Sequence, residues 1–285
     1  MLNATDMSQG SRFTFLQSQF DVMCDDLDQF SLGRAVAASS NFPIAFQAMT
    51  LDNYAGNCGY QLPDWVVLAE GDIDNNLGRY KTAEVFRTYQ YRQSRPHIHL
   101  LDGGVADNLG LRGPIQAITS DDTEFGIKHK INTGKIKKLL VITVDARSQV
   151  DLTYDSDTSP PGLVDVLTAV TSTPIDNLSF ETTQILRQSF TNWNKDKNYY
   201  ADCQNILQHN CPSAKIATPA PNIPDLEFIY IGFDMLKDPD ERYRFFNIPT
   251  TFSLSENDIN DVRAVAGRLL DDSKSFKKFV NGLSN

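Results

Sequence analysis

One short segment, residues 98–110, combines an apolar strand, a carboxylate and a sharp glycine turn. Its apolar run leads directly to Asp102, Gly103 and Gly104 follow, and a helix-like run extends over 109–118. A charged group at the carboxyl end of a strand lies where open α/β sheets bind ligands. The glycines let a substrate or a second loop approach the backbone closely. Two interpretations of Asp102 are open: a functional carboxylate, or a side chain that only caps the next helix.

Strand-like and helix-like segments alternate along the chain, which predicts an α/β fold with a mostly parallel sheet covered on both faces. The expected strands are 12–16, 97–101, 138–144 and 226–233. The expected helices are 31–40, 109–118, 163–193, 257–270 and a short one that begins at Phe276. An interruption at Pro174 is expected in the helix 163–193. Residues 83–91 are ambiguous, and their aromatic and β-branched side chains favour a strand. The regions 51–80 and 196–224 are interpreted as loop-rich insertions in one domain that spans residues 1–285.

Charge and hydropathy exclude several classes of partner. The chain has 36 acidic and 26 basic residues and a net charge of −10. This balance argues against nucleic acid, whose binding depends on neutralising phosphates with Lys and Arg. It also disfavours docking on anionic lipid. No apolar run reaches the ~18 residues needed for a transmembrane segment, and the N-terminus lacks the pattern of a signal peptide.

The four cysteines do not form a C-x-x-C pair, so a zinc site is not expected. Disulfides Cys24–Cys58 and Cys203–Cys211 would suit an exported protein, periplasmic or associated with an outer membrane. Four reduced cysteines in a cytoplasmic protein is the alternative. The sequence favours the disulfides and an exported location slightly.

Other segments carry a family resemblance together with the Asp-Gly-Gly turn. Residues 34–46 form a small-residue helix that Pro43 stops, and the opening contains Asn3-Ala4-Thr5-Asp6 before a hairpin. Within the first segment, residues 35–43 match the pattern A-x-x-A-S-x-x-x-P. With 238–242 and 245–250 near the end, these motifs resemble the patatin-like phospholipase family in its bacterial form. The resemblance covers most of the chain.

The resemblance implies a three-layer α/β/α fold and hydrolysis of acyl esters in phospholipids or other lipids by a Ser-Asp dyad without histidine. Asp102 matches the catalytic aspartate of that family, with Gly103 and Gly104 as the active-site turn. Its role would be that of a general base for the serine. No cofactor and no metal are implied, and the expected ligand is a lipid or another acyl ester.

Two elements of the family are missing. The sequence contains no G-x-S-x-G nucleophile elbow and no glycine-rich oxyanion loop. The chain therefore resembles the C-terminal part of such a hydrolase, incomplete at its N-terminal side and inactive alone. That part would leave an exposed sheet edge and a bare apolar face. A separate N-terminal portion is the expected partner. The alternative is a non-catalytic module that binds lipid or completes another subunit.

Histidines and serines were considered as further catalytic groups. Strand alternation places His97 and His99 away from Asp102, and His129 and His209 lie in other polar segments. The two serines of the small-residue helix, Ser39 and Ser40, lack flanking glycines. Their expected role is close packing against the active-site turn.

Two acidic segments have other expected roles. Asp107 and Asn108 are expected to cap the helix after the turn, and a supporting role for Asp107 near Asp102 is the alternative. Residues 72–78 are similar to a calcium loop, but the glycine is one place late and Ala83 replaces the glutamate at the twelfth position. No metal is expected there.

Overall fold

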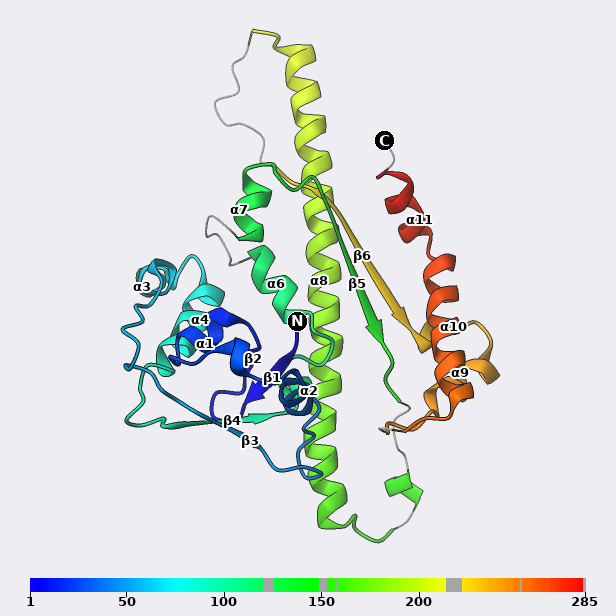
Figure 1. Ribbon diagram of the computed structural model, residues 1–285. Coiled ribbons are helices and arrows are strands. Elements are labelled where there is room, and N and C mark those ends of the chain that lie inside the picture. Colours follow the sequence, from blue (N-terminus) through cyan, green and yellow to red (C-terminus); the bar gives the residue numbers. More distant parts are fainter. Residues whose placement is uncertain (120–125, 149–152, 157, 214–221, 252, 284–285) are drawn as a thin grey trace. The chain divides into compact units, whose positions relative to one another are not determined.

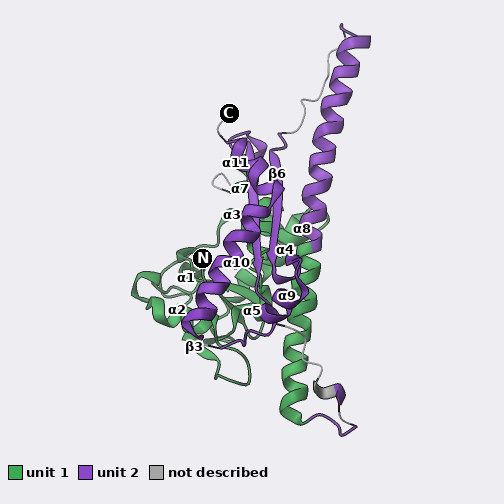
Figure 2. Ribbon diagram, turned by 90° about the vertical axis from the view of Figure 1, so that its right-hand side faces the viewer, with its two compact units in different colours: residues 1–130, 162–183 green, residues 131–161, 184–285 purple. Residues whose placement is uncertain are grey.

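The computed structural model describes residues 1–119, 126–148, 153–156, 158–213, 222–251 and 253–283 (Figure 1). The fold is mixed α/β, as predicted. Two compact units can be distinguished, coloured separately in Figure 2. The first comprises Met1–Lys130 and Gly162–Thr183, and the second Ile131–Pro161 and Gln184–Asn285.

The first unit contains a four-stranded antiparallel sheet in the order β2-β1-β4-β3. Its strands are β1 (Asn3–Asp6), β2 (Ser11–Thr14), β3 (Met49–Asp52) and β4 (His97–Leu101). Strand β1 pairs with β2 on one side and with β4 on the other, where Thr5 is opposite Leu101. The opening N-A-T-D segment therefore lies in the centre of the sheet, next to the strand that leads to Asp102.

Short helices connect and follow these strands along the chain. They are α1 (Gln17–Asp21), α2 (Leu32–Ser39), α3 (Asp64–Leu68), α4 (Leu77–Thr88), α5 (Gly103–Asp107), α6 (Arg112–Thr119) and α7 (Ile127–Asn132), with 3₁₀ turns η1 (Leu27–Gln29) and η2 (Ala69–Asp72). Ser31 precedes α2 as its N-cap residue, and the Asn76 side chain caps α4 by accepting from the Arg79 amide. A buried cluster joins the strands to α1, α2 and α4, and includes Phe13, Phe20, Ala38, Tyr89 and Leu100.

The disulfide expected between Cys24 and Cys58 is present. It closes a sequence separation of 34 residues, which the chain-entropy model values at about 4 kcal/mol. The second expected disulfide is wrong, because Cys203 and Cys211 are free thiols. Cys203 lies on a helix that ends beside Cys211, and eight residues of helix separate two Cα atoms by about 12 Å. A disulfide spans less than about 7 Å.

The second unit is built on a parallel pair of strands, β5 (Lys138–Asp145) and β6 (Asp225–Gly232). The helix α8 (Leu163–Asn210) belongs to both units, and its later part lies against one face of this pair. There the rings of Phe190 and Phe228 are 6.4 Å apart, and Asn194 Nδ2 donates to the Leu226 carbonyl over 2.7 Å.

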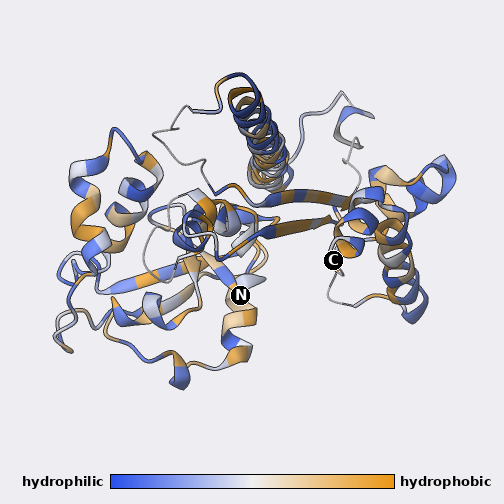
Figure 3. Cartoon of the chain, turned by 90° about the horizontal axis from the view of Figure 1, so that it is seen from above, coloured by the Kyte–Doolittle hydropathy of each residue, from blue (hydrophilic) through white to orange (hydrophobic). Residues whose placement is uncertain are grey.

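The other face packs on C-terminal helices. These are α9 (Pro239–Phe246), α10 (Glu256–Asp272) and α11 (Lys274–Asn281), and 3₁₀ turns lie at η3 (Thr153–Ser156) and η4 (Phe233–Met235). Ile229 and Ile231 of β6 are buried with Val265 and Leu269 of α10. Ser255 caps α10 by accepting from the Asp258 amide over 3.1 Å. Figure 3 colours much of both strands as hydrophobic.

Several expectations about the fold are wrong. Among the described strands only β5 and β6 are parallel, so the sheet is not mostly parallel. Residues 83–91, expected to be a strand, lie mainly in α4, where Phe86 packs 5.6 Å from Trp65 between ring centroids. Side-chain packing outweighs β-propensity there. The loop expected over 51–80 contains α3 and the start of α4.

Two further boundaries differ in the helical segments. The helix expected at 109–118 begins later, as α6, and a separate short helix, α5, precedes it. The long helix runs through Pro174 without ending and continues to Asn210, into the region expected to be a loop. It ends just before Cys211-Pro212, because the residue before a proline disfavours helical backbone. The prolines Pro219 and Pro221 of that region lie outside the described residues.

A search of the described helices finds none that is long and apolar enough to cross a bilayer.

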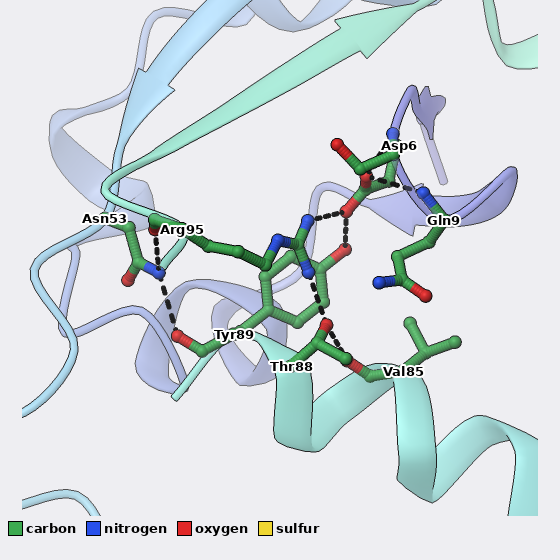
Figure 4. A network of polar contacts seen from close by, with 8 residues as sticks. Asp6, Gln9, Asn53, Val85, Thr88, Tyr89 and Arg95 are labelled. Atoms are coloured by element: carbon green, nitrogen blue, oxygen red, sulfur yellow. Dashed lines mark hydrogen bonds and ion pairs between the residues drawn. The ribbon is translucent and has the colours of Figure 1, made fainter. Parts of the chain in front are cut away.

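A buried ionic network anchors the centre of the first unit (Figure 4). Asp6 is fully buried, and its Oδ2 accepts from the Tyr89 hydroxyl over 2.8 Å and from Arg95 Nη2 over 2.6 Å. Its Oδ1 accepts from the amides of Ser8 and Gln9 in the β1–β2 turn. Burial and the neighbouring Asp6 raise the pKa of Tyr89 well above its usual value. The network therefore ties the hairpin to segments more than eighty residues away.

Asp6→Asn is expected to lower the free energy of unfolding by about 3 kcal/mol, because it leaves the largely buried Arg95 without its counter-charge. Lys81→Met is the matched control in the same unit. It breaks an exposed pair with Glu84 and should lower the free energy of unfolding far less than Asp6→Asn does, because water screens this pair. Urea titration followed by circular dichroism measures both. Equal effects would contradict the assignment of Asp6 as the anchor.

Candidate functional site

The candidate site is the turn between β4 and α5. Asp102 follows the last residue of β4, and α5 begins at Gly103. The Asp102 side chain caps this five-residue helix, since its Oδ1 accepts from the Gly104 amide over 2.7 Å. The capping interpretation of Asp102 is therefore confirmed as a structural role. Catalysis by the same carboxylate stays a prediction.

Strand β1 fixes the backbone of this turn. The Thr5 hydroxyl donates to the Asp102 carbonyl over 2.7 Å and accepts from the Ala106 amide over 3.0 Å. Thr5 is 1% exposed, so both bonds form away from water. One side chain thus holds the residue before α5 and the interior of α5 in fixed positions relative to β1.

The loop after α2 fixes the same turn from another direction. The Asp102 amide donates to the Asn41 carbonyl over 3.0 Å. The buried Asn41 side chain donates to the carbonyls of Leu100, over 3.3 Å, and Gln47, over 2.6 Å. Asn41 lies just beyond the A-x-x-A-S helix. The three N-terminal segments that carry the family resemblance therefore meet at Asp102.

Each glycine of the turn fills a tight space. A Cβ on Gly103 would lie 2.4 Å from the backbone oxygen of Asn3, and a Cβ on Gly104 would lie 2.9 Å from Asp102 Oδ1 and 2.8 Å from Asn108 Oδ1. The first obstacle is backbone in the central strand, whereas the second consists of side chains. Gly103 is thus needed for the approach of β1, and Gly104 for the space beside the carboxylate.

The environment of the Asp102 carboxylate favours its protonated form. Burial raises its pKa above the ordinary value of 3.8, and the hydrogen bond from the Gly104 amide opposes this shift in part. In the described part of the chain, that amide is the one hydrogen-bond donor to this carboxylate. A half-buried carboxylate with a raised pKa is a better proton acceptor than a solvated one.

The histidines do not join this site. His97 and His99 were expected to face away from Asp102, and both are exposed on β4. His97 Nδ1 lies 2.9 Å from Asp52 Oδ1, and His99 Nδ1 lies 3.0 Å from Thr50 Oγ1. The other two are on helices, His129 on α7 and His209 near the end of α8.

The serines of α2 have structural surroundings. Ser40 Oγ donates to the Val36 carbonyl over 3.1 Å, within its own helical turn. Ala35 and Ala38 are buried, and α2 contacts β1, β4 and α5. The predicted close packing of this small-residue helix against the turn is confirmed. No hydrogen bond between either serine and Asp102 is found among the described residues.

Asp107 is a cap, as predicted. Both of its carboxylate oxygens lie 3.1 Å from the Arg112 amide at the start of α6. Asn108 instead approaches Gly104 from the end of α5. The contacts of Asp107 leave no direct link to the Asp102 carboxylate in the described structure.

In the calcium-like loop of residues 72–78, the first carboxylate is bonded to other side chains. Asp72 forms an ion pair with Arg79 and accepts from Asn75 Nδ2 over 3.0 Å. The described residues contain no group of three or more acidic, His or Cys side chains arranged to hold a metal ion.

Sequence reasoning missed Thr5 and Asn41 as parts of the site. Both lie inside motifs that carried the resemblance, and membership of those motifs was the available signal. Their contacts join residues 97 and 59 positions apart, and local sequence patterns do not report such contacts.

Comparisons with protein-family models, curated proteins and solved structures found no match to this chain.

The two glycines of the turn should respond differently to alanine. Gly103→Ala forces a Cβ into the backbone of β1 and is expected to cost about 3 kcal/mol or more, at the upper end for overpacking. Gly104→Ala meets side-chain atoms that can move, so a cost of about 1 kcal/mol is expected. Urea denaturation of the two variants gives the comparison. A larger loss for Gly104→Ala would show that the fixed contact with β1 is not what the turn requires.

Proposed function

We propose that this chain is the aspartate-bearing part of a patatin-like acyl-ester hydrolase, with Asp102 as the general base of a Ser-Asp dyad. One observation supports the proposal most. The Asp102 turn is held by Thr5 and by Asn41, which belong to the other two motifs that resemble the family. Both bonds are made with the backbone of Asp102, so they fix the point at which its side chain leaves the end of β4.

The chemistry follows from the carboxylate. Asp102 takes the proton of a serine hydroxyl as the serine oxygen bonds to the ester carbonyl carbon. It then returns this proton to the departing alcohol, which leaves an acyl-serine. Water is activated by the same base in the second step and releases the fatty acid. The raised pKa of Asp102, which burial causes, makes it a stronger base than a solvated aspartate.

The serine and the oxyanion donors must come from a segment that this sequence lacks. We therefore propose an N-terminal portion with a G-x-S-x-G elbow as the partner, and a lipid or other acyl ester as the substrate. The three-layer patatin-like sheet is part of the same proposal. The parallel pair β5–β6 with helices on both faces is the element that supports it. The disulfide Cys24–Cys58 favours an exported protein.

A second candidate is a non-catalytic module that binds lipid or completes another subunit. The cap at α5 favours it, because Asp102 already has a complete structural role in the bond to Gly104. The two candidates differ in whether Asp102 is needed for turnover.

In a protein in which a G-x-S-x-G segment completes this chain, Asp102→Asn should lower kcat for p-nitrophenyl esters by roughly 100- to 10,000-fold, because an amide cannot accept the serine proton. Asp107→Asn is the matched control and should change kcat little, since Asn caps helices about as well as Asp. Melting curves separate loss of catalysis from loss of fold.

The chain without the G-x-S-x-G segment is the negative control for this assay. It should neither turn over the ester nor react with a fluorophosphonate at Ser39 or Ser40. Stoichiometric labelling of either serine, or full activity of folded Asp102→Asn, would refute the proposed dyad.

A further inference from the structure

The disulfide of the first unit joins the turn after α1 to the loop between β3 and α3. Within this unit Cys58 is exposed and Cys24 is half-buried. Thiols reduce exposed disulfides more readily than buried structural ones, and exposed disulfides are the labile or regulatory ones. The cross-link is therefore placed where the redox state of the surroundings can act on the fold.

The backbone around both cysteines has unusual conformations. Cys24 has a φ of 56°, in the left-handed region that residues with a side chain rarely adopt. On the other side of the bond, Gly56 and Gly59 have φ values of 88° and 68° and bracket Cys58. Glycine adopts such angles at little cost, so it can absorb a rotation of the chain. The Cys58 segment, residues 56–59, thus has a point of rotation at each end.

The rest of this loop is anchored without the disulfide. Asn53 is 2% exposed, and its side chain donates to the carbonyls of Tyr89, over 2.8 Å, and Arg95, over 2.9 Å (Figure 4). Its Oδ1 accepts from the Ala55 amide over 3.1 Å. At the other end, Tyr60 packs against the buried cluster of the sheet. Loss of the cross-link leaves both anchors in place.

The Cys58 segment depends on the disulfide more directly. The Cys58 amide donates to Cys24 Sγ over 3.3 Å, a contact that the cross-link itself creates. The Asn57 amide donates to the Tyr54 carbonyl over 3.1 Å within the loop. The Asn57 side chain accepts from Arg92 Nη1 over 2.9 Å in an exposed position. The disulfide is therefore the strongest restraint on this segment.

The same loop lines two open cavities of the first unit. One, of about 470 Å³, is lined by Tyr54, Cys58 and Tyr60 together with residues between 21 and 26. The other, of about 640 Å³, is lined by residues 55–57 and 90–94. A movement of the Cys58 segment changes the wall of both cavities.

We propose that Cys24–Cys58 is a redox-sensitive switch that fixes this wall when oxidised and releases it when reduced. A dithiol supplies the electrons. One of its thiolates attacks the sulfur of Cys58, and Cys24 leaves as a thiolate and takes up a proton. The second thiol of the reductant then displaces Cys58. The reductant becomes a disulfide and the chain gains two thiols, so two electrons and two protons are transferred.

Amide hydrogen exchange on the folded chain tests the switch. Reduction by dithiothreitol should raise the exchange rates of Asn57 and Cys58 by about tenfold or more, as expected for local opening. The Ala55 amide, which Asn53 holds, should keep its rate, and so should the amides of β4. The double substitution Cys24→Ser, Cys58→Ser should reproduce this pattern without a reductant.

The two free cysteines provide the matched control. Cys203→Ser with Cys211→Ser removes thiols that are not cross-linked and should leave exchange in the loop unchanged. Re-oxidation of the reduced native chain should restore the slow rates. Three results overturn the proposal: exchange that is the same in both redox states, faster exchange throughout the first unit, or a disulfide that dithiothreitol does not reduce in the folded chain. Circular dichroism verifies the fold in each state.

Discussion

The candidate site depends on the two hydrogen bonds of the Thr5 hydroxyl. This hydroxyl joins the central strand β1 to the Asp102 carbonyl and to the Ala106 amide, inside a region that water does not reach. The same strand provides the Asn3 oxygen that excludes a side chain at residue 103, and it ends in Asp6. Asp6 in turn is held by Tyr89 and Arg95. The position of the carboxylate at residue 102 is therefore determined by four consecutive residues at the start of the chain.

The second unit follows a different principle. Its parallel strands are stabilised by helices, α8 on one face and α10 with α11 on the other, rather than by further described strands. The cover is complete over β6 and incomplete over β5. On β5, Ile142 and Val144 remain exposed.

The sequence predicted those elements whose cause is local. Strand β4 follows from the alternation over 97–101, and α10 from its apolar face and the Ser255 cap. Failures occurred where distant contacts decide the outcome. Helix α4 carries strand-forming residues, but Trp65 and the Asn76 cap hold it as a helix.

The site was predictable only in part for the same reason. Asp102 and its glycines were found from a local pattern, whereas Thr5, Asn41 and the Asp6 network act across the sequence.

The sequence also underestimated the length of helix α8. Its later half lacks an apolar period, and the proline at position 212 sets its end.

Burial outweighs the capping hydrogen bond in its effect on the pKa of Asp102. A carboxylate dominated by its cap has a lowered pKa, because the amide bond and the helix dipole favour the ionised form. The carboxyl carbon of Asp102, followed by NMR in a pH titration of the folded chain, separates the two. The account predicts a midpoint above 3.8. The folded state then holds the Asp102 proton more tightly than the unfolded state does. The contribution of this group to the free energy of unfolding is therefore present below pH 3.8 and is lost as the pH rises through the folded-state pKa. A midpoint at or below 3.8 would contradict the account and leave Asp102 as a cap.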